Sequence, residues 1–325
     1  MPVRFPAPLE PGDLIAVVAP SSGVRPAMHE RLDAAIDLLR ASGFRVREGA
    51  SLRCQRKGTS ADAMERASEL MGALLDDEVA AIIPPWGGER AIELLRLMDF
   101  DRLATAPPKW FSGFSDLSTI QIPLLLRSSW ASIHGPNLMQ LPEFELDATT
   151  ARVFDAWRCG PGGTLVQSAA ATTTAVRLDR ATEPVCFSGR MLGGCLDSIS
   201  RLAGSPYGAV PAFGQAHRQD GLIVFLENAE MKPFELARAL SGLRFAGWFD
   251  AVTGILIGRN ALDDGEQVDD FSARDAIEAA LGDLDCPVIL DVDIGHVSPQ
   301  WSIVQGAKGT VEWSDGTATL HQVLE

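Results

Sequence analysis

A serine on a turn between a strand and a helix is the residue of this chain best suited to chemistry. In residues 109–116, Lys-Trp-Phe-Ser-Gly-Phe-Ser-Asp, an extended apolar run meets Gly113, Ser115 and Asp116, and a helix-like segment follows at 117–123. Amides at a helix start stabilise negative charge on a group beside them. The turn therefore suits Ser115 as a nucleophile, although a serine that only caps a helix would show the same pattern.

A serine hydroxyl needs a base within hydrogen-bond reach, and the base needs a partner that orients it. Of the five histidines, His134 and His296 each follow a predicted strand, and these residues alone leave both open as the base. Glu227 ends the apolar strand predicted at 222–226 and is the candidate orienting carboxylate. The three catalytic roles would thus be filled from distant parts of the chain.

Metal and disulfide chemistry find weaker support. Asp291 and Asp293 alternate to one face of a strand and precede His296, so a metal cluster is an alternative, but no second histidine accompanies them. The five cysteines are scattered without a Cys-x-x-Cys pair, which favours neither a disulfide framework nor a thiolate zinc site. We predict no metal and no cofactor.

Composition excludes several classes of protein. The chain has 325 residues, 46% hydrophobic and 22% charged, which is ordinary for a globular protein of two domains. With 28 basic and 43 acidic residues the net charge is −15, and such a surface repels nucleic acid. No apolar run approaches the ~20 residues that span a bilayer, and the start lacks the apolar core of a signal peptide. We expect a cytoplasmic protein without membrane or nucleic-acid partners.

The first half alternates between strand and helix patterns. Strands are predicted at 13–19, 44–47, 79–83, 110–111 and 131–134, with helices at 27–41 and 60–75 and after Gly88. This order predicts an α/β fold with a doubly wound parallel sheet of Rossmann or flavodoxin type. Sites in such sheets lie at the carboxyl ends of strands. Three turns qualify, at 20–23, 84–88 and 113–116, and none carries a nucleotide-binding glycine motif.

The second half is richer in β-structure. A glycine-rich shift at 158–175 predicts a nucleophile-bearing domain at 1–160, a linker at 161–175 and a smaller C-terminal α/β domain at 176–325 that carries the acid and base. Strands are expected at 183–187, 221–226, 251–257 and 287–290, and a helix at 233–243. Gly189 is expected to open a glycine turn that runs into a helix ending near Leu202, and Asp315-Gly316 to form a hairpin turn.

Four short motifs resemble those of the LD-carboxypeptidase family of serine peptidases, and the likeness extends along the whole chain. They are Gly87-Gly88, Gly113-Phe-Ser-Asp116, Leu226-Glu-Asn228 and Gly295-His296. The family includes murein-tetrapeptide LD-carboxypeptidases and microcin C immunity peptidases. The resemblance implies Ser115 as nucleophile, His296 as general base and Glu227 as its orienting carboxylate. It also implies an oxyanion hole from the backbone N–H groups of Asp116 and of Gly88 or Gly87, a homodimer, and no metal.

Some positions depart from the family pattern. Trp86 precedes the two glycines where the family often has Arg or Ile, and it is a candidate, with Gly87, to line the substrate pocket. Asn228 stands where the family often has Asp. Residues 57–67 look more like the microcin C immunity branch than the murein branch. Arg90 or Arg190 is the candidate anchor for a substrate carboxylate.

The resemblance and the residues together predict a serine carboxypeptidase or amidase with a Ser-His-Glu triad. Its substrate would be a small peptide or a peptidyl- or aminoacyl-nucleotide conjugate, as in microcin C immunity. The alternative within the family is a murein tetrapeptide LD-carboxypeptidase that removes terminal D-Ala. Two readings from other classes stay open: a non-catalytic two-lobed protein that binds a small ligand, and a metal hydrolase that uses Asp291, Asp293 and His296.

Overall fold

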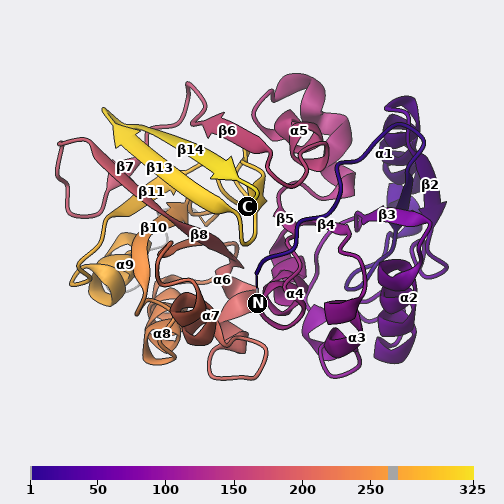
Figure 1. The fold of residues 1–325 in the computed structure, drawn as a ribbon, viewed down its shortest axis with the longest axis horizontal. Coiled ribbons are helices and arrows are strands. Elements are labelled where there is room, and N and C mark those ends of the chain that lie inside the picture. The colour runs from indigo at the N-terminus through magenta and orange to yellow at the C-terminus, as the bar shows by residue number, and fades with distance from the viewer. Residues whose placement is uncertain (1, 263–269) are drawn as a thin grey trace.

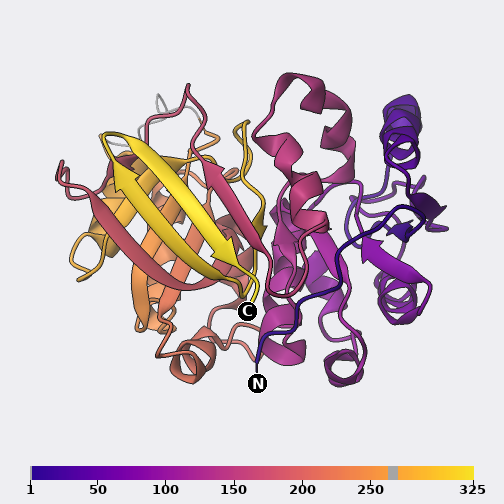
Figure 2. The same cartoon turned by 45° about the horizontal axis from the view of Figure 1, so that its top comes forward.

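Two β-sheets form the centres of two lobes that lie side by side (Figure 1), and they remain side by side when the molecule is turned (Figure 2). The structure is a computed structural model and describes residues 2–262 and 270–325. We call the first sheet with its helices the first lobe, and the second sheet with its helices the second lobe. No helix within the described ranges is long and apolar enough to cross a bilayer.

The first lobe has the predicted parallel sheet. Its strands follow the order β12-β5-β4-β3-β1-β2, and every pair except β12 with β5 is parallel. The strands of the first half are β1 (Leu14–Val17), β2 (Arg45–Glu48), β3 (Val79–Ile82), β4 (Trp110–Gly113) and β5 (Ile133–His134). The helices between them are α1 (His29–Ala41), α2 (Ala63–Leu75), α3 (Phe100–Thr105), α4 (Ser118–Ser128) and α5 (Val153–Trp157).

Both faces of this sheet are covered, which explains why its central strands are apolar throughout. All four residues of β1 are buried. Leu14 and Ala16 contribute to one hydrophobic core, whereas Ile15 and Val17 contribute to another on the opposite face. The helix expected after Gly88 is only a short 3-10 turn. The short 3-10 segments are η1 (Pro26–Met28), η2 (Ala91–Leu94), η3 (Ser115–Leu117), η4 (Leu138–Leu146), η5 (Thr150–Arg152) and η6 (Ser200–Leu202).

The second lobe is built on a mixed sheet with the order β6-β14-β13-β8-β9-β10-β11-β7. Its parallel centre consists of β8 (Val185–Cys195), β9 (Leu222–Glu227), β10 (Val252–Gly258) and β11 (Val288–Val292). Antiparallel strands flank it: β6 (Thr164–Ser168), β7 (Val176–Arg177), β13 (Lys308–Ser314) and β14 (Thr317–Val323). The helices are α6 (Leu196–Ile199), α7 (Val210–Ala216), α8 (Pro233–Phe245) and α9 (Ala273–Leu281).

Two local predictions for this half have different outcomes. The hairpin is confirmed, because β13 pairs with β14 and the turn residues Asp315 and Gly316 both have positive φ. The glycine turn at Gly189 is wrong, because β8 runs through it to Cys195. The helical segment expected to end near Leu202 is present as α6 followed directly by η6. A Cβ at Gly189 would lie 2.8 Å from the backbone of Leu222 on the neighbouring strand. This glycine thus permits close strand packing and does not form a turn.

The chain crosses between the lobes twice in ways that the sequence did not indicate. Residues 161–175, expected as a linker, include β6, which pairs with β14 of the second sheet. Conversely, β12 (Ile303–Val304) comes from the second half and pairs with β5 of the first sheet, so that Ile303 lies opposite His134. The two lobes are therefore joined by backbone hydrogen bonds beside a candidate catalytic histidine.

Candidate active site

Ser115 lies on a sharp turn at the carboxyl end of β4, as the sequence predicted. The strand ends at Gly113, and η3 begins at Ser115 and leads into α4. Ser115 has a φ of +67°, in the left-handed region that residues other than glycine rarely adopt. Such backbone strain is typical of functional sites. The turn presents the hydroxyl beside the first amides of the helical segment.

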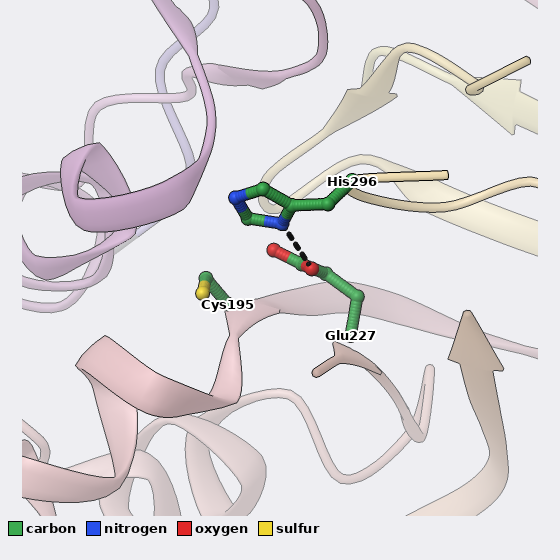
Figure 3. Close-up of side chains that lie close together, drawn as sticks. All are labelled: Cys195, Glu227 and His296. Carbon is green, nitrogen blue, oxygen red and sulfur yellow. Dashed lines mark hydrogen bonds and ion pairs between the residues drawn. The ribbon is translucent and has the colours of Figure 1, made fainter. Parts of the chain in front are cut away.

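His296 and Glu227 meet Ser115 from the second lobe. Nε2 of His296 lies 3.1 Å from Oγ of Ser115. Nδ1 of the same ring lies 2.7 Å from Oε2 of Glu227, and Figure 3 shows this second contact. Glu227 is the last residue of β9 and is fully buried. Since a carboxylate can only accept, Nδ1 carries the proton and Nε2 is left to accept from the serine hydroxyl. The three side chains thus form a continuous hydrogen-bonded chain.

Gly295 allows the loop before His296 to pass directly over this carboxylate. Its φ is +94°, and a Cβ there would lie 2.5 Å from both the Cγ and Oε2 atoms of Glu227. Any side chain at this position would collide with the group that orients the imidazole. The Gly295-His296 pair in the sequence is therefore explained by close backbone approach as well as by the histidine itself.

His134 also reaches Glu227, but from the other side. It is fully buried, and its Nε2 lies 4.0 Å from Oε1 of Glu227. Within the described part of the chain neither of its nitrogens makes a hydrogen bond. Only His296 of the two candidate bases contacts Ser115. The geometry thus distinguishes the two candidates: one histidine faces the hydroxyl, and the other lies behind the carboxylate.

The two histidines have opposite protonation tendencies. Burial alone would lower the pKa of His296, but its hydrogen bond to Glu227 and the charges of Glu227, Asp197 and Glu230 outweigh burial and raise that pKa. For His134, burial dominates over the attraction of Glu227 and lowers its pKa to about 4. At neutral pH, His134 is therefore an uncharged neighbour, whereas His296 is a stronger base than a free imidazole.

The Gly87-Gly88 turn lies in contact with Ser115. A Cβ at Gly87 would lie 2.8 Å from Cβ of Ser115 and 2.9 Å from the amide nitrogen of Asp116. Gly88 has a φ of +144°, and a Cβ there would overlap the hydroxyls of Ser21 and Ser22. Neither position has room for a side chain, so both residues must be glycine for the turn to keep this arrangement. The turn brings bare backbone beside the hydroxyl, where the oxyanion donors Gly88 and Asp116 were predicted.

The carboxylate of Asp116 links the segments after β1, β3 and β4 through hydrogen bonds. Its Oδ2 accepts from the Ser21 hydroxyl at 2.6 Å and from the Ala91 amide at 2.8 Å. It thereby joins the turn after β1, the turn after β3 and the turn after β4. From the sequence, only the backbone N–H of Asp116 was expected to have a role, and this structural role of its side chain was missed. The available signal was an acid immediately after the candidate nucleophile.

Two cavities open on the Ser115–His296 pair. One, of about 680 Å³, lies towards α8, and its polar lining includes Glu89, Asp197, Arg201, Glu230 and Arg238. The other, of about 590 Å³, lies on the first lobe, and its lining includes Arg25, Arg31, Gln55, Trp86 and Asn137. Ser115, His296 and Gly88 line both. A substrate could therefore extend to either side of the hydroxyl.

The predicted substrate-binding residues have different positions. Trp86 and Gly87 line the first-lobe cavity, and the Trp86 indole donates to the Gly23 carbonyl at 3.0 Å. Arg90 instead donates to Glu93 at 2.8 Å and to the Lys57 carbonyl at 3.0 Å, and it lines a separate hollow.

Other arginines line the two cavities. Arg190, the second candidate anchor, donates to Asp220 at 2.8 Å. The cavity towards α8 is lined by Arg201 and Arg238, and the first-lobe cavity by Arg25 and Arg31. No motif marked these four residues in the sequence, because their places depend on helix and loop packing.

The Asp291, Asp293 and His296 cluster is not assembled. Asp293 is fully buried and accepts from the Thr173 hydroxyl at 2.6 Å and pairs with Arg259 at 2.8 Å. Among the described residues, the group with metal-ligating atoms close together is Cys195, Glu227 and His296, whose ligand atoms all lie within 4.8 Å of one another (Figure 3). No motif in the sequence connects Cys195 with the site, because the pairing of β8 with β9 brings it beside Glu227.

Several known proteins are similar to this chain along nearly its whole length. Among curated relatives, a Streptomyces coelicolor protein named as a carboxypeptidase is 29% identical over 98% of this chain and 96% of its own length. A Bacillus subtilis protein named as a murein peptide carboxypeptidase is 26% identical over 97% of this chain and 94% of its own. The microcin C7 self-immunity protein MccF of Escherichia coli is 22% identical over 97% and 95%.

Solved structures share the fold. An MccF-like protein from Bacillus anthracis has a TM-score of 0.84 at 20% identity, over 99% of this chain and all of its own. A muramoyltetrapeptide carboxypeptidase from Oxalobacter formigenes has a TM-score of 0.75 at 23% identity, over 95% and 98%. MccF in complex with glutamyl sulfamoyl guanosine has a TM-score of 0.78 at 19% identity, over 97% of each chain.

Family profiles cover most of the chain. The profile described as the LD-carboxypeptidase N-terminal domain matches residues 15–135, which contain Ser115, and the profile of the C-terminal domain matches residues 188–311, which contain Glu227 and His296. The matches follow one another in the order of the two lobes. This chain belongs to the LD-carboxypeptidase family.

Proposed function

We propose that the protein is a serine carboxypeptidase or amidase in which Ser115 is the nucleophile, His296 the general base and Glu227 its orienting carboxylate. The observation that carries this proposal is the hydrogen-bonded chain from Oγ of Ser115 through the imidazole to Glu227, at 3.1 and 2.7 Å. Membership of a carboxypeptidase family supports the reaction class. The strained turn at Ser115 supports its role as the attacking group.

In the proposed reaction, Oγ of Ser115 attacks the amide carbonyl while Nε2 of His296 takes its proton. Glu227 stabilises the imidazolium that forms, and that imidazolium then protonates the leaving amine. Water releases the acyl group in a second step that reverses these roles. The backbone N–H groups of Gly88 and Asp116 would bind the developing oxyanion, and such a donor stabilises a transition state by about 2.7–4 kcal/mol.

We propose a small amide substrate whose two parts occupy the two cavities beside Ser115. MccF has been captured with glutamyl sulfamoyl guanosine and with aspartyl sulfamoyl adenosine, which are aminoacyl conjugates of nucleosides. In this chain, Trp86 offers an aromatic surface beside Arg25 and Arg31 in the first-lobe cavity, which suits a base and an anionic group. Removal of terminal D-Ala from a murein tetrapeptide is the second candidate activity, favoured by the murein peptide carboxypeptidase among the relatives.

The test is hydrolysis of both compounds by the wild type, by Ser115→Ala and by Ser42→Ala, a control serine that follows directly after the end of α1. Chromatographic detection of free amino acid and nucleoside, or of D-Ala, identifies the substrate. We expect Ser115→Ala to abolish cleavage of whichever compound the wild type cleaves, and Ser42→Ala to retain it. Equal rates for Ser115→Ala and the wild type would refute the assigned nucleophile.

A non-catalytic ligand-binding protein is the competing function. A serine-directed fluorophosphonate distinguishes the two, because only an activated hydroxyl reacts quickly with it. We expect adduct formation on the peptide that contains Ser115 and none after Ser115→Ala. The homodimer and the cytoplasmic location stay predictions. Light scattering coupled to size-exclusion chromatography measures the first, and cell fractionation measures the second.

A further inference from the structure

The Cys195 thiol lies beside the proposed triad without having a part in it. Cys195 is the last residue of β8, is 1% exposed and lines the cavity towards α8. Its sulfur, a carboxylate oxygen of Glu227 and a ring nitrogen of His296 lie within 4.8 Å of one another. Figure 3 shows Cys195 and Glu227 at the ends of neighbouring strands and His296 reaching towards them from a loop.

These three groups are a ligand set for a thiophilic divalent cation. Zn²⁺ binds thiolate, imidazole and carboxylate in a tetrahedron, and three protein ligands leave one position open. Oε1 of Glu227 is buried and has no hydrogen-bond partner within the described residues. An unpaired carboxylate oxygen in a buried position is costly, and a bound cation would satisfy it.

The surroundings also favour a cation. Glu89, Asp197 and Glu230 line the same cavity, and with other acids they outnumber the two arginines of its lining. Burial raises the pKa of Glu89, and the negative charges of Glu230, Asp116 and Asp197 raise it further. Burial and the charges of Glu227 and Asp197 likewise raise the pKa of the Cys195 thiol, so metal binding must displace its proton. This concentration of negative charge lowers the free energy of a divalent cation at the site.

We propose that Cys195, Glu227 and His296 form an inhibitory binding site for Zn²⁺ or a similar thiophilic cation, with the fourth position open to the cavity. The binding site stands on the geometry alone, whereas its inhibitory effect rests on the proposed function. Inhibition does not depend on which nitrogen binds. A metal on Nε2 occupies the lone pair that accepts the Ser115 proton, and a metal on Nδ1 removes the hydrogen bond to Glu227.

Binding is measured directly with Cd²⁺ as the probe, because a cadmium thiolate has an ultraviolet charge-transfer band that does not require catalysis. Titration of the reduced wild-type protein should give one equivalent of tight binding per chain and the band. Cys195→Ser should abolish the band and weaken Cd²⁺ binding by more than about 100-fold, since even the loss of groups that only support a ligand costs 10–100-fold. Cys54→Ser removes an exposed thiol that is not one of the three proposed ligands, so this variant should keep both the band and the affinity for Cd²⁺.

His296→Ala checks that more than one ligand is involved, because the ring lies at the surface and its removal should not prevent folding. We expect weaker Cd²⁺ binding with the thiolate band retained at high metal concentration. An unchanged affinity in His296→Ala would overturn the three-ligand site, as would a wild type without the band or a Cys195→Ser variant that keeps it. Circular dichroism verifies that each variant is folded.

The inhibitory effect is measured by adding Zn²⁺ to the wild type and to Cys54→Ser and following hydrolysis. The rate of reaction with the fluorophosphonate is a second readout. Zn²⁺ should slow both hydrolysis and labelling of Ser115, and a chelator should restore them. If the proposed function fails, hydrolysis is absent but the Cd²⁺ band persists. If the metal site fails, hydrolysis proceeds and the Cys195-dependent band is missing.

Discussion

Replacement of Glu227 by glutamine tests the proposed catalytic geometry most directly. Glutamine has nearly the same volume, so the buried position at the end of β9 stays filled while the negative charge is removed. The His296 side chain is 27% exposed and Glu227 is fully buried, so solvent screens their interaction only partly. Glu227→Gln therefore changes the electrostatics of the imidazole with little change in packing.

The expected loss follows from the distance between the two groups. Nδ1 and Oε2 lie 2.7 Å apart, which places the centres of the two charges about 4 Å apart once His296 is protonated. At an effective dielectric constant of about 20, that pair attracts by about 4 kcal/mol. Each 1.4 kcal/mol changes a rate tenfold, so kcat should fall by about 10³-fold. KM should change less, because the charge pair forms during the reaction.

The pH profile gives a second and independent readout. His296 must be neutral to act as a base, so kcat/KM of the wild type rises with pH through the His296 pKa, which Glu227 helps to raise. Without that carboxylate, only the charges of Asp197 and Glu230 oppose burial, which is the largest effect on this group and lowers its pKa. The acid limb should therefore move to lower pH in Glu227→Gln, although the maximum is smaller.

The assay is steady-state hydrolysis of the cleaved substrate from pH 5 to 9, with Glu312→Gln on β13 as an exposed control. Ring NMR shifts of His296 report its titration without substrate. A Glu227→Gln variant within tenfold of the wild type, with an acid limb that does not move, would contradict the assignment of Glu227. If Glu227→Gln loses all activity, circular dichroism shows whether the fold is lost. If the variant is folded, the NMR titration of His296 shows whether the imidazole pKa has changed.

Three further predictions concern neighbouring residues. The pKa of His134 is about 4 in the folded protein and about 6.5 in an unfolded chain. As the pH drops between these values the unfolded chain binds the proton first, so the free energy of unfolding falls by about 3 kcal/mol. Urea unfolding at several pH values should show a smaller loss for His134→Gln. Gly87→Ala places a methyl 2.8 Å from Cβ of Ser115, so it should lower kcat/KM at least tenfold and also lower the melting temperature. Asp116→Ala leaves Ser21 and the Ala91 amide unpaired and should cost about 1–3 kcal/mol in urea unfolding.

The sequence was sufficient for features that depend on local patterns. Alternating strands and helices predicted the parallel sheet of the first lobe, and glycines at strand ends marked the turns around Ser115. Both follow from periodicity and from backbone space, which a sequence carries directly. The order of short motifs added the link between Ser115, Glu227 and His296, which lie far apart in the chain.

Features that depend on packing between distant segments were missed. Gly189 resembles a turn residue, and only the adjacent strand at Leu222 shows that it serves close pairing. Cys195 resembles any buried cysteine until β8 and β9 place it beside Glu227. The arginines of the cavities belong to helices and loops whose orientation no local pattern specifies. His134 and His296 looked equivalent because each follows a strand, and the sequence does not indicate on which side of Glu227 each lies.

The pairing of β12 with β5 limits how a substrate can enter. The segment that follows His296 continues into a strand hydrogen-bonded to His134 and Ile133 of the first lobe. Separation of the lobes would therefore break the backbone hydrogen bonds beside His134. It would also pull His296 away from the Ser115 hydroxyl. A substrate of the proposed kind would therefore have to enter through the openings of the two cavities while the lobes stay joined.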